Sequence, residues 1–235
     1  MEHSVKLPPD DYHTTVTPLW TFANHPNKKA IYEANRHYDV DYEWWATNYD
    51  YFIEQMAEKG VDVEGKDIAF SGFCSQGDGA CFIKCRIDWP KFFGQLNGKY
   101  PMLRQFVNEL PNPTMYHRGF YYHEYSVSIS LETMYFEENA VWALFYNRFQ
   151  KATSLYHSDY YDSEDFNDRR NRYETRLRAE LDELETEMAE TLRGYMKDLY
   201  RDLEEDYDEL TSDKHLAERF ANDDFMFAEN GTIHY

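Results

Sequence analysis

The longest regular pattern of apolar positions lies near the C-terminal end of the chain, over residues 169–210. Apolar residues recur there at steps of three and four, with an average step of about 3.7 residues. This spacing is close to the turn of a straight α-helix, so the pattern predicts one long helix. Its apolar positions are Leu177, Leu181, Leu184, Met188, Leu192, Tyr195, Leu199, Leu203, Tyr207 and Leu210.

Shorter stretches also show apolar residues at helical spacing. Residues 41–59 form the clearest of these, and Gly60 follows them as a residue type that suits the end of a helix. Asn27 and Ser212 are of the types that cap helix N-termini. The other helices are predicted over residues 27–38, 89–96, 101–110, 137–156 and 212–220.

Alternation of apolar and polar residues predicts four strands, arranged as two hairpins. The clearest case is residues 126–131, where three apolar residues alternate with three serines. Such alternation is typical of an antiparallel strand with one buried face. We expect the two hairpins to join in one sheet. The four strands are predicted over residues 67–75, 80–88, 115–122 and 125–132.

These elements together predict the α+β class. We expect an antiparallel sheet of about four strands packed against helices, including the long C-terminal helix. Residues 1–26 contain four prolines and are predicted to be irregular, apart from a short strand within residues 16–22. The chain contains no internal repeat and no low-complexity linker, so residues 1–235 are predicted to form a single domain.

The chain is strongly acidic, with 44 Asp and Glu residues against 24 Lys and Arg residues and a net charge of −20. Phosphate backbones and anionic membranes would repel such a surface, so direct binding to nucleic acid or to a membrane is not expected. Residues 171–210 hold 14 acidic residues against 6 basic ones, which predicts an acidic outer face on the long helix. That face either provides solubility or imitates a polyanion and occupies a basic groove of a partner.

Several features favour a cytoplasmic protein. Residues 1–10 lack the apolar segment of a signal peptide, and no apolar run approaches the ~20 residues that span a bilayer. The three cysteines, Cys74, Cys81 and Cys85, include no C-x-x-C pair. We therefore expect small thiols in a reducing compartment, with no disulfide scaffold and no zinc ribbon.

The first candidate site is the connection within the first hairpin, residues 71–79. Three glycines allow its backbone to present N–H groups at close range, and Ser75, Gln76 and Asp78 add a hydroxyl, an amide and a carboxylate. It does not match the phosphate-binding loop motif, and Asp78 would repel phosphate. The alternative is an ordinary hairpin turn whose glycines only permit positive φ.

The second candidate site is the segment of residues 117–124, in the second hairpin. In a strand, His117, Tyr121 and His123 would share one face, and Arg118, Tyr122 and Glu124 the other. Two histidines near a carboxylate could bind a metal or carry out acid–base chemistry. The spacing matches no zinc motif, so we expect neither a metal nor a cofactor. The alternative is polar and aromatic cross-strand pairing on an exposed face.

We expect both segments to lie near the same edge of the sheet. Together they could hold a nucleotide-like small ligand, or equally a segment of a partner protein. No nucleophile elbow, no H-E-x-x-H motif and no lysine nucleophile context occurs in the chain, which favours binding over catalysis. The predicted contact residues are Ser75, Gln76, Asp78, His117, Arg118, Tyr122, His123 and Glu124.

Four motifs in order resemble a family of bacteriophage and prophage proteins that is sometimes described as the antitoxin of a toxin–antitoxin system. In that family a "dYeWW" helix precedes an "FSGFxSQGDGACF" hairpin, an "HRGxYYHE" strand and a "YdyLTSD" segment. The matching segments here are residues 42–45, 70–82, 117–124 and 207–213. Residues 137–169 depart from the family's pattern.

The resemblance implies a phage-encoded accessory protein that acts on host machinery or host defence in the host cytoplasm. It implies no reaction and assigns no catalytic residue. We therefore expect an antitoxin-like interaction protein or inhibitor that binds a host protein. A nucleotide-binding sponge or a small enzyme remains the alternative. The long helix also leaves open a homodimer, because a coiled coil could use its apolar positions.

Overall fold

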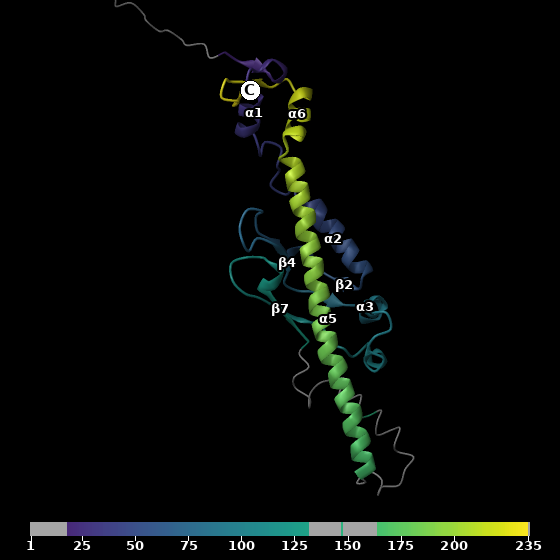
Figure 1. The fold of residues 1–235 in the computed structure, drawn as a ribbon. Helices are drawn as coiled ribbons and strands as arrows, with labels where there is room; N and C mark the ends of the chain where they lie inside the picture. Colours follow the sequence, from purple (N-terminus) through teal and green to yellow (C-terminus); the bar gives the residue numbers. More distant parts are fainter. Residues whose placement is uncertain (1–17, 132–146, 148–163, 235) are drawn as a thin grey trace, which may run out of the picture. The chain divides into compact units, whose positions relative to one another are not determined.

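The computed structural model describes residues 18–131, residue 147 and residues 164–234 (Figure 1). The chain divides into two compact units. Unit 1 comprises Met1–Tyr42 and Asp206–Tyr235, and unit 2 comprises Glu43–Glu205. Compact units can be parts of one domain or separate domains, so the single domain stays a prediction. The predicted helix over residues 137–156 lies outside the described residues, apart from residue 147.

Unit 2 contains most of the regular structure and confirms the predicted α+β class. Its α-helices are α2 (Ala46–Glu58), α3 (Trp89–Gln95) and α5 (Glu164–Leu210), whose last residues belong to unit 1. Its short 3₁₀ helices are η2 (Gly65–Asp67), η3 (Leu103–Phe106) and η4 (Glu124–Ser126). Its strands are β2 (Val61–Asp62), β3 (Ile68–Phe70), β4 (Ala80–Phe82), β5 (Arg86–Ile87), β6 (Thr114–His117) and β7 (Val127–Ser130).

The strands of unit 2 pair as three two-stranded antiparallel sheets, β2–β5, β3–β4 and β6–β7. Both predicted hairpins are present, but they do not join in one four-stranded sheet. The predicted strands run over eight or nine residues, whereas the observed ones have only three or four. Where the hairpins meet, they meet through the loops beyond the strand ends, where no hydrogen-bonded ladder forms.

The core of unit 2 is built on the apolar face of α5. The long helix is confirmed as one unbroken element of 47 residues, and it runs alongside α2, α3 and the small sheets (Figure 1). Burying each leucine of this face stabilises the unit by ~1.5–3 kcal/mol. The buried residues of α5 in this core are Leu177, Leu181, Leu184, Met188, Ala189, Leu192, Met196, Leu199 and Leu203. This packing commits the apolar positions of α5 to the chain's own core.

The N-terminal part of unit 2 packs aromatic side chains against this face. Helix α2 buries Tyr49, Phe52 and Met56, as its periodicity predicts. It begins at Ala46 rather than at residue 41, because the preceding residues form turns that place Trp44 and Trp45 against the core. At its end, Gly60 has φ of +78°, in agreement with the predicted stop.

Three glutamates of α5 face inward and hold loops of unit 2. Glu180 accepts hydrogen bonds from the backbone N–H groups of Met102 and Leu103 at the start of η3, at 3.0 and 3.1 Å. Glu185 accepts one from the N–H of Leu131, just after β7, at 2.8 Å. The number of acidic residues in the sequence of α5 is therefore larger than the number on its outer face, because these carboxylates accept hydrogen bonds from the protein's own N–H groups.

Glu187 is the third of these inward glutamates. It accepts hydrogen bonds from the Lys99 ammonium at 2.7 Å and from the Tyr100 hydroxyl. The hydrogen bonds from Lys99 and Tyr100 hold the pKa of Glu187 below its ordinary value. This carboxylate thus ties the loop after α3 to the long helix.

Unit 1 brings the described N-terminal residues together with the C-terminal end of the chain. It contains β1 (Trp20–Thr21), η1 (Phe22–Asn24), α1 (Lys28–Ala34), α6 (Asp213–Asn222), β8 (Met226–Phe227) and β9 (Ile233–His234). The strands form an antiparallel sheet in the order β1-β8-β9. The core consists of Phe22, Ile31, Leu216, Phe220 and Phe227.

Polar contacts fix the elements of unit 1. The predicted caps are confirmed, since Asn27 accepts from the N–H of Ala30 at 3.3 Å and Ser212 from the N–H of His215 at 3.0 Å. His25 is buried, with its Nδ1 accepting from a backbone N–H and its Nε2 2.8 Å from the carbonyl oxygen of Ala228. Because Nδ1 accepts, Nε2 carries the proton and donates.

The first prediction concerns the close approach of two backbones in unit 1. Gly231 has φ of +86°, and a Cβ there would lie 2.2 Å from the carbonyl oxygen of Ala30. Gly231→Ala should therefore lower the free energy of unfolding of unit 1 by more than ~2 kcal/mol. Gly98→Ala is the matched control, because Gly98 has φ of +79° with open space around it. It should cost only the ~1–2 kcal/mol of left-handed strain. Equal shifts in thermal unfolding would contradict the steric account.

The second prediction concerns the pH dependence of stability. Because the folded state lowers the pKa of Glu187, its contribution is present above the ordinary pKa of 4.5 and is lost as pH falls through the folded pKa. Glu187→Gln should cost about 1 kcal/mol at neutral pH and nothing at low pH, as measured by urea unfolding from pH 7 to pH 3. The exposed Glu54, changed to Gln, is the control. A cost that does not change with pH would refute the assignment.

Candidate functional site

The loop after β3 is closed by its own aspartate. The carboxylate of Asp78 accepts hydrogen bonds from the backbone N–H groups of Cys74 and Ser75, at 2.9 and 2.6 Å. The N–H of Asp78 in turn donates to the carbonyl oxygen of Ser75 at 3.1 Å. The sequence suggested that these backbone N–H groups could bind an external anion. In the structure they donate to the Asp78 carboxylate instead.

Aromatic side chains pack this loop against strand β3 and helix α5. Phe73 stacks on Phe70 with ring centroids 5.9 Å apart, and it also lies 5.5 Å from the ring of Tyr200 on α5. The Tyr200 hydroxyl donates to the carbonyl oxygen of Gly72 at 3.1 Å. Burial, together with the charges of Glu204 and Asp78, raises the pKa of Tyr200, so its hydroxyl stays protonated and remains a donor.

The cysteines of the first hairpin differ in exposure. Cys81 and Cys85 are buried, and burial raises the pKa of each thiol to about 12. Both are therefore unreactive thiols, in agreement with the prediction of small buried thiols. Cys74 is exposed, at the start of the closed loop.

The second segment is a folded loop rather than a continued strand. Strand β6 ends at His117, and Gly119 turns the chain with φ of +93°. The prediction that alternate residues of this segment share a face is therefore wrong beyond His117. His117 in fact stacks on Tyr122, with ring centroids 5.1 Å apart, although the strand pattern assigned them to opposite faces.

Both histidines of this segment already have partners within it. His117 Nε2 lies 2.9 Å from the carbonyl oxygen of Tyr121. His123 Nδ1 accepts from the N–H of Tyr125 at 3.3 Å and lies 3.1 Å from a carboxylate oxygen of Glu124. The histidines therefore fix the conformation of the loop. In the residues that the structure describes, no group of three or more His, Cys, Asp and Glu side chains is arranged to hold a metal ion.

The two predicted segments lie against each other, although not in one sheet. A Cβ on Gly77 would lie 3.2 Å from the ring of Tyr121, and one on Gly79 would lie 2.6 Å from the Cα of His123. These glycines permit the close approach. The structure thus brings the loop of Ser75, Gln76 and Asp78 together with the segment from His117 to Glu124.

Exposure divides the predicted contact residues into two sets. Ser75, Gln76 and Arg118 are exposed, and Asp78, His117, Tyr122, His123 and Glu124 are partly buried. The partly buried residues largely hold the two loops in shape. That any of these residues contacts a ligand or a partner stays a prediction.

Sequence reasoning missed the most exposed feature of this region, which we call the aromatic patch. It comprises Tyr116, Phe120, Tyr121 and Tyr125, which are 66%, 96%, 52% and 73% exposed. The guanidinium of Arg193 on α5 lies over the Tyr125 ring, 5.5 Å from its centroid. The signal was present in the sequence as a run of aromatic residues. The alternative of cross-strand pairing placed that run on an exposed face, but the aromatic residues were not singled out as a contact surface.

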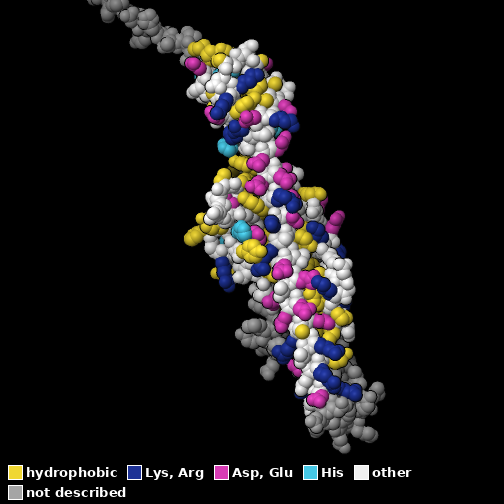
Figure 2. All heavy atoms as spheres, viewed as in Figure 1, with side chains coloured by type: hydrophobic (Ala, Val, Ile, Leu, Met, Phe, Trp, Pro, Cys, Tyr) yellow, Lys and Arg dark blue, Asp and Glu magenta, His cyan; other side chains and the backbone are white. Residues whose placement is uncertain are grey.

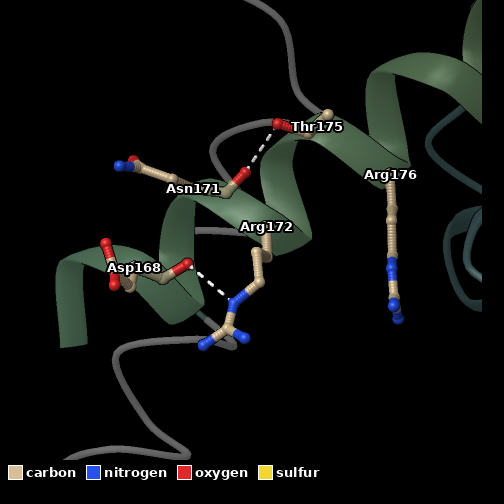
Figure 3. Close-up of a pocket in the computed structure, with 5 residues that line it drawn as sticks. All are labelled: Asp168, Asn171, Arg172, Thr175 and Arg176. Carbon is tan, nitrogen blue, oxygen red and sulfur yellow. Dashed lines mark hydrogen bonds between the residues drawn. The ribbon is translucent and has the colours of Figure 1, made fainter. Parts of the chain in front are cut away.

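A separate hollow of about 510 Å³ lies beside the N-terminal part of α5 (Figure 3). Within it, Arg172 Nε donates to the carbonyl oxygen of Asp168 at 3.3 Å, and the Thr175 hydroxyl donates to that of Asn171 at 2.8 Å. The described residues that line the hollow all come from α5, so they form one wall only. Those residues are Asp168, Asn171, Arg172, Thr175 and Arg176.

Comparison with known proteins assigns the family. The model of a domain of unknown function, DUF8835, matches residues 44–100 and 102–213, which is more than half of the chain. The chain belongs to the DUF8835 family. The DUF8835 match includes both candidate segments and α5. No curated protein and no solved structure matches the chain. Among the described residues, no helix combines the length and the apolar composition needed to cross a bilayer.

The third prediction tests whether Asp78 closes its loop. Asp78→Ala leaves the N–H groups of Cys74 and Ser75 without this acceptor, so it should lower stability by about 1–2 kcal/mol. Amide hydrogen exchange at these two positions should accelerate in the variant. Gln76→Ala, in the same loop, is the control and should change stability by less than ~0.5 kcal/mol. Unchanged exchange at both amides in Asp78→Ala would show that the carboxylate does not hold the loop.

Proposed function

We propose that this DUF8835 member acts by binding a partner protein and that the aromatic patch is its contact surface. The observation that carries the proposal is the exposure of four aromatic rings within ten residues, 116–125, from the end of β6 to η4. Stacking with His123 orients Tyr125, and Gly77 lies against the ring of Tyr121. The rings of Tyr121 and Tyr125 are thus held in place while they remain exposed to solvent.

The chemistry of the patch suits a protein partner. Tyr and Arg are enriched among the residues that contribute most to protein–protein binding, and aromatic rings provide large contact areas at low entropy cost. Phe120 is almost fully exposed, which leaves its apolar surface in water. Arg118 is exposed beside it and adds hydrogen-bond donors at the rim. A partner that covers Phe120 would therefore gain both apolar burial and directional contacts.

We further propose an antitoxin-like role, in which the protein inhibits a host factor or host-defence protein in the host cytoplasm. The support for this role is the resemblance of four sequence motifs to a family of phage and prophage proteins. A partner with a basic surface would also find an exposed carboxylate on α5 in unit 2, at Asp182. The inward glutamates are not available to it.

The alternative, a nucleotide-like ligand held by the two loops, has less support. Such a ligand would need the backbone N–H groups of Cys74 and Ser75, and the Asp78 carboxylate already takes both. One ring nitrogen of each histidine is also already bound to the backbone. Protein binding requires neither rearrangement, so it is the preferred function.

The fourth prediction tests the aromatic patch. A protein captured from host lysate by the wild type should be lost with a Tyr116→Ser, Phe120→Ser double variant, because the partner would lose its apolar anchor. Against that purified partner, calorimetry should show a dissociation constant raised about 30-fold or more. Tyr51→Ser is the matched control, because Tyr51 is 61% exposed on α2.

The control variant should bind as the wild type does, and circular dichroism should confirm that both variants fold. Recovery of the same proteins by the wild type, the double variant and the control would refute the aromatic patch as the binding surface. A nucleotide that raises the thermal stability of the wild type but not of Arg118→Ala would support the ligand alternative instead.

A further inference from the structure

The outer face of α5 in unit 2 carries an ordered charge pattern that neither the core nor the proposed partner site uses. Six exposed residues follow one another at steps of 4, 3, 4, 3 and 4 residues. This spacing places them in one stripe along the helix. We call them the α5 stripe: Arg172, Arg176, Ala179, Glu183, Thr186 and Glu190.

Charge is segregated along the α5 stripe. Its N-terminal end carries Arg172 and Arg176, its middle carries the small residue Ala179, and its C-terminal end carries Glu183 and Glu190. Figure 2 shows dark blue side chains gathered near the N-terminal end of α5 and magenta ones further along. The neighbouring sequence reinforces the pattern, because residues 169–178 contain five arginines and one glutamate, in a chain whose net charge is −20.

We propose that the α5 stripe is the contact face of an antiparallel homodimer, with a second copy of this chain as its occupant. Under a two-fold axis, the basic end of one stripe meets the acidic end of the other. The proposal rests on the charge complementarity between two antiparallel copies of the α5 stripe. A parallel arrangement would place like charges opposite each other.

The helix geometry matches this arrangement. Arg172 and Glu190 are 190 − 172 = 18 residues apart, which is five turns of ~3.6 residues, so they point in the same direction from the helix axis. Each lies nine residues, or about 13.5 Å, from position 181, where we place the two-fold axis. In the antiparallel pair, Arg172 of one copy and Glu190 of the other are therefore at the same level.

The second charged pair is offset by less than one turn. At the same axis position, Arg176 of one copy lies level with Thr186 of the other and about 4.5 Å along the axis from Glu183. A long arginine side chain covers that distance. The small residues Ala179 and Thr186 at the centre allow the helices to approach. Symmetry repeats both pairs, so the interface contains four ion pairs.

The side chains of the α5 stripe are exposed. Arg172 donates from Nε to its own helix, and within the described residues none of the four charged side chains of the stripe belongs to an ion pair. The dimer does not need the apolar positions of α5, which are buried in the core. It therefore differs from the coiled coil that the sequence left open.

Long-range repulsion between two acidic chains sets the conditions for the test. At an ionic strength of ~0.15 M, charges more than about 8 Å apart are largely screened, whereas pairs in contact are screened less. Sedimentation velocity at this ionic strength, over a range of protein concentrations, should show the wild type approaching twice the monomer mass. This measurement needs no partner protein, so its failure would leave the aromatic patch untouched.

Complementary charge reversals give the decisive fifth prediction. Arg172→Glu, Arg176→Glu makes the stripe wholly acidic, and Glu183→Arg, Glu190→Arg makes it wholly basic. Each variant alone should self-associate roughly tenfold more weakly than the wild type or worse. An equimolar mixture should restore a dimer that contains one copy of each, detected by differently labelled chains.

Matched controls separate the stripe from net charge. Lys28→Glu, Lys29→Glu on α1 and Glu54→Arg, Glu58→Arg on α2 make the same changes in net charge at exposed positions elsewhere. Both controls should dimerise as the wild type does. A wild type that stays monomeric, a mixture of the complementary variants that fails to associate, or controls that weaken the dimer equally would each overturn the proposal.

Discussion

Packing of the apolar face of α5 is the interaction on which the rest of unit 2 depends. Among the described residues of unit 2, each sheet has two strands, and a two-stranded sheet of this size is at best marginally stable in water. The buried leucines of α5 supply a shared core that the sheets cannot form among themselves. The helix also contacts both loops of the candidate site, because the Tyr200 hydroxyl donates to the carbonyl oxygen of Gly72 and Arg193 lies over the Tyr125 ring. The aromatic patch is therefore presented by a scaffold whose central element is one helix.

Local sequence signals predicted the elements well where one physical requirement decides the conformation. Helix α5 follows from its apolar spacing, and the alternation around Val127 and Ile129 follows from one buried strand face. The caps at Asn27 and Ser212 follow from the need to satisfy free N–H groups at helix ends. Each of these signals depends only on residues that are close together in the sequence. The sequence alone is therefore enough to predict the element.

The errors occurred where the outcome depends on contacts distant in sequence. Two hairpins share a sheet only if an edge strand of one forms hydrogen bonds with an edge strand of the other. The alternation of apolar and polar residues within each hairpin does not show whether this happens. The segment after His117 was predicted as a strand because its residues suit one, but Gly119 turns the chain and stacking of His117 on Tyr122 stabilises the turn. For the candidate site, the residues were correctly expected to come together. The closure of the first loop by Asp78 was not expected, because it requires the loop to fold back on its own carboxylate.

The division of the chain bears on how far these arguments extend to the family. The DUF8835 match begins at residue 44 and ends at residue 213, so it covers unit 2 and leaves out most of unit 1. The residues of the aromatic patch and of the α5 stripe both lie within the match. Most of unit 1 lies outside it. Its buried His25 and the contact of Gly231 with Ala30 join the two separate stretches of chain that make up this unit. The binding role that we propose rests on residues inside the family match, whereas these contacts hold unit 1 together.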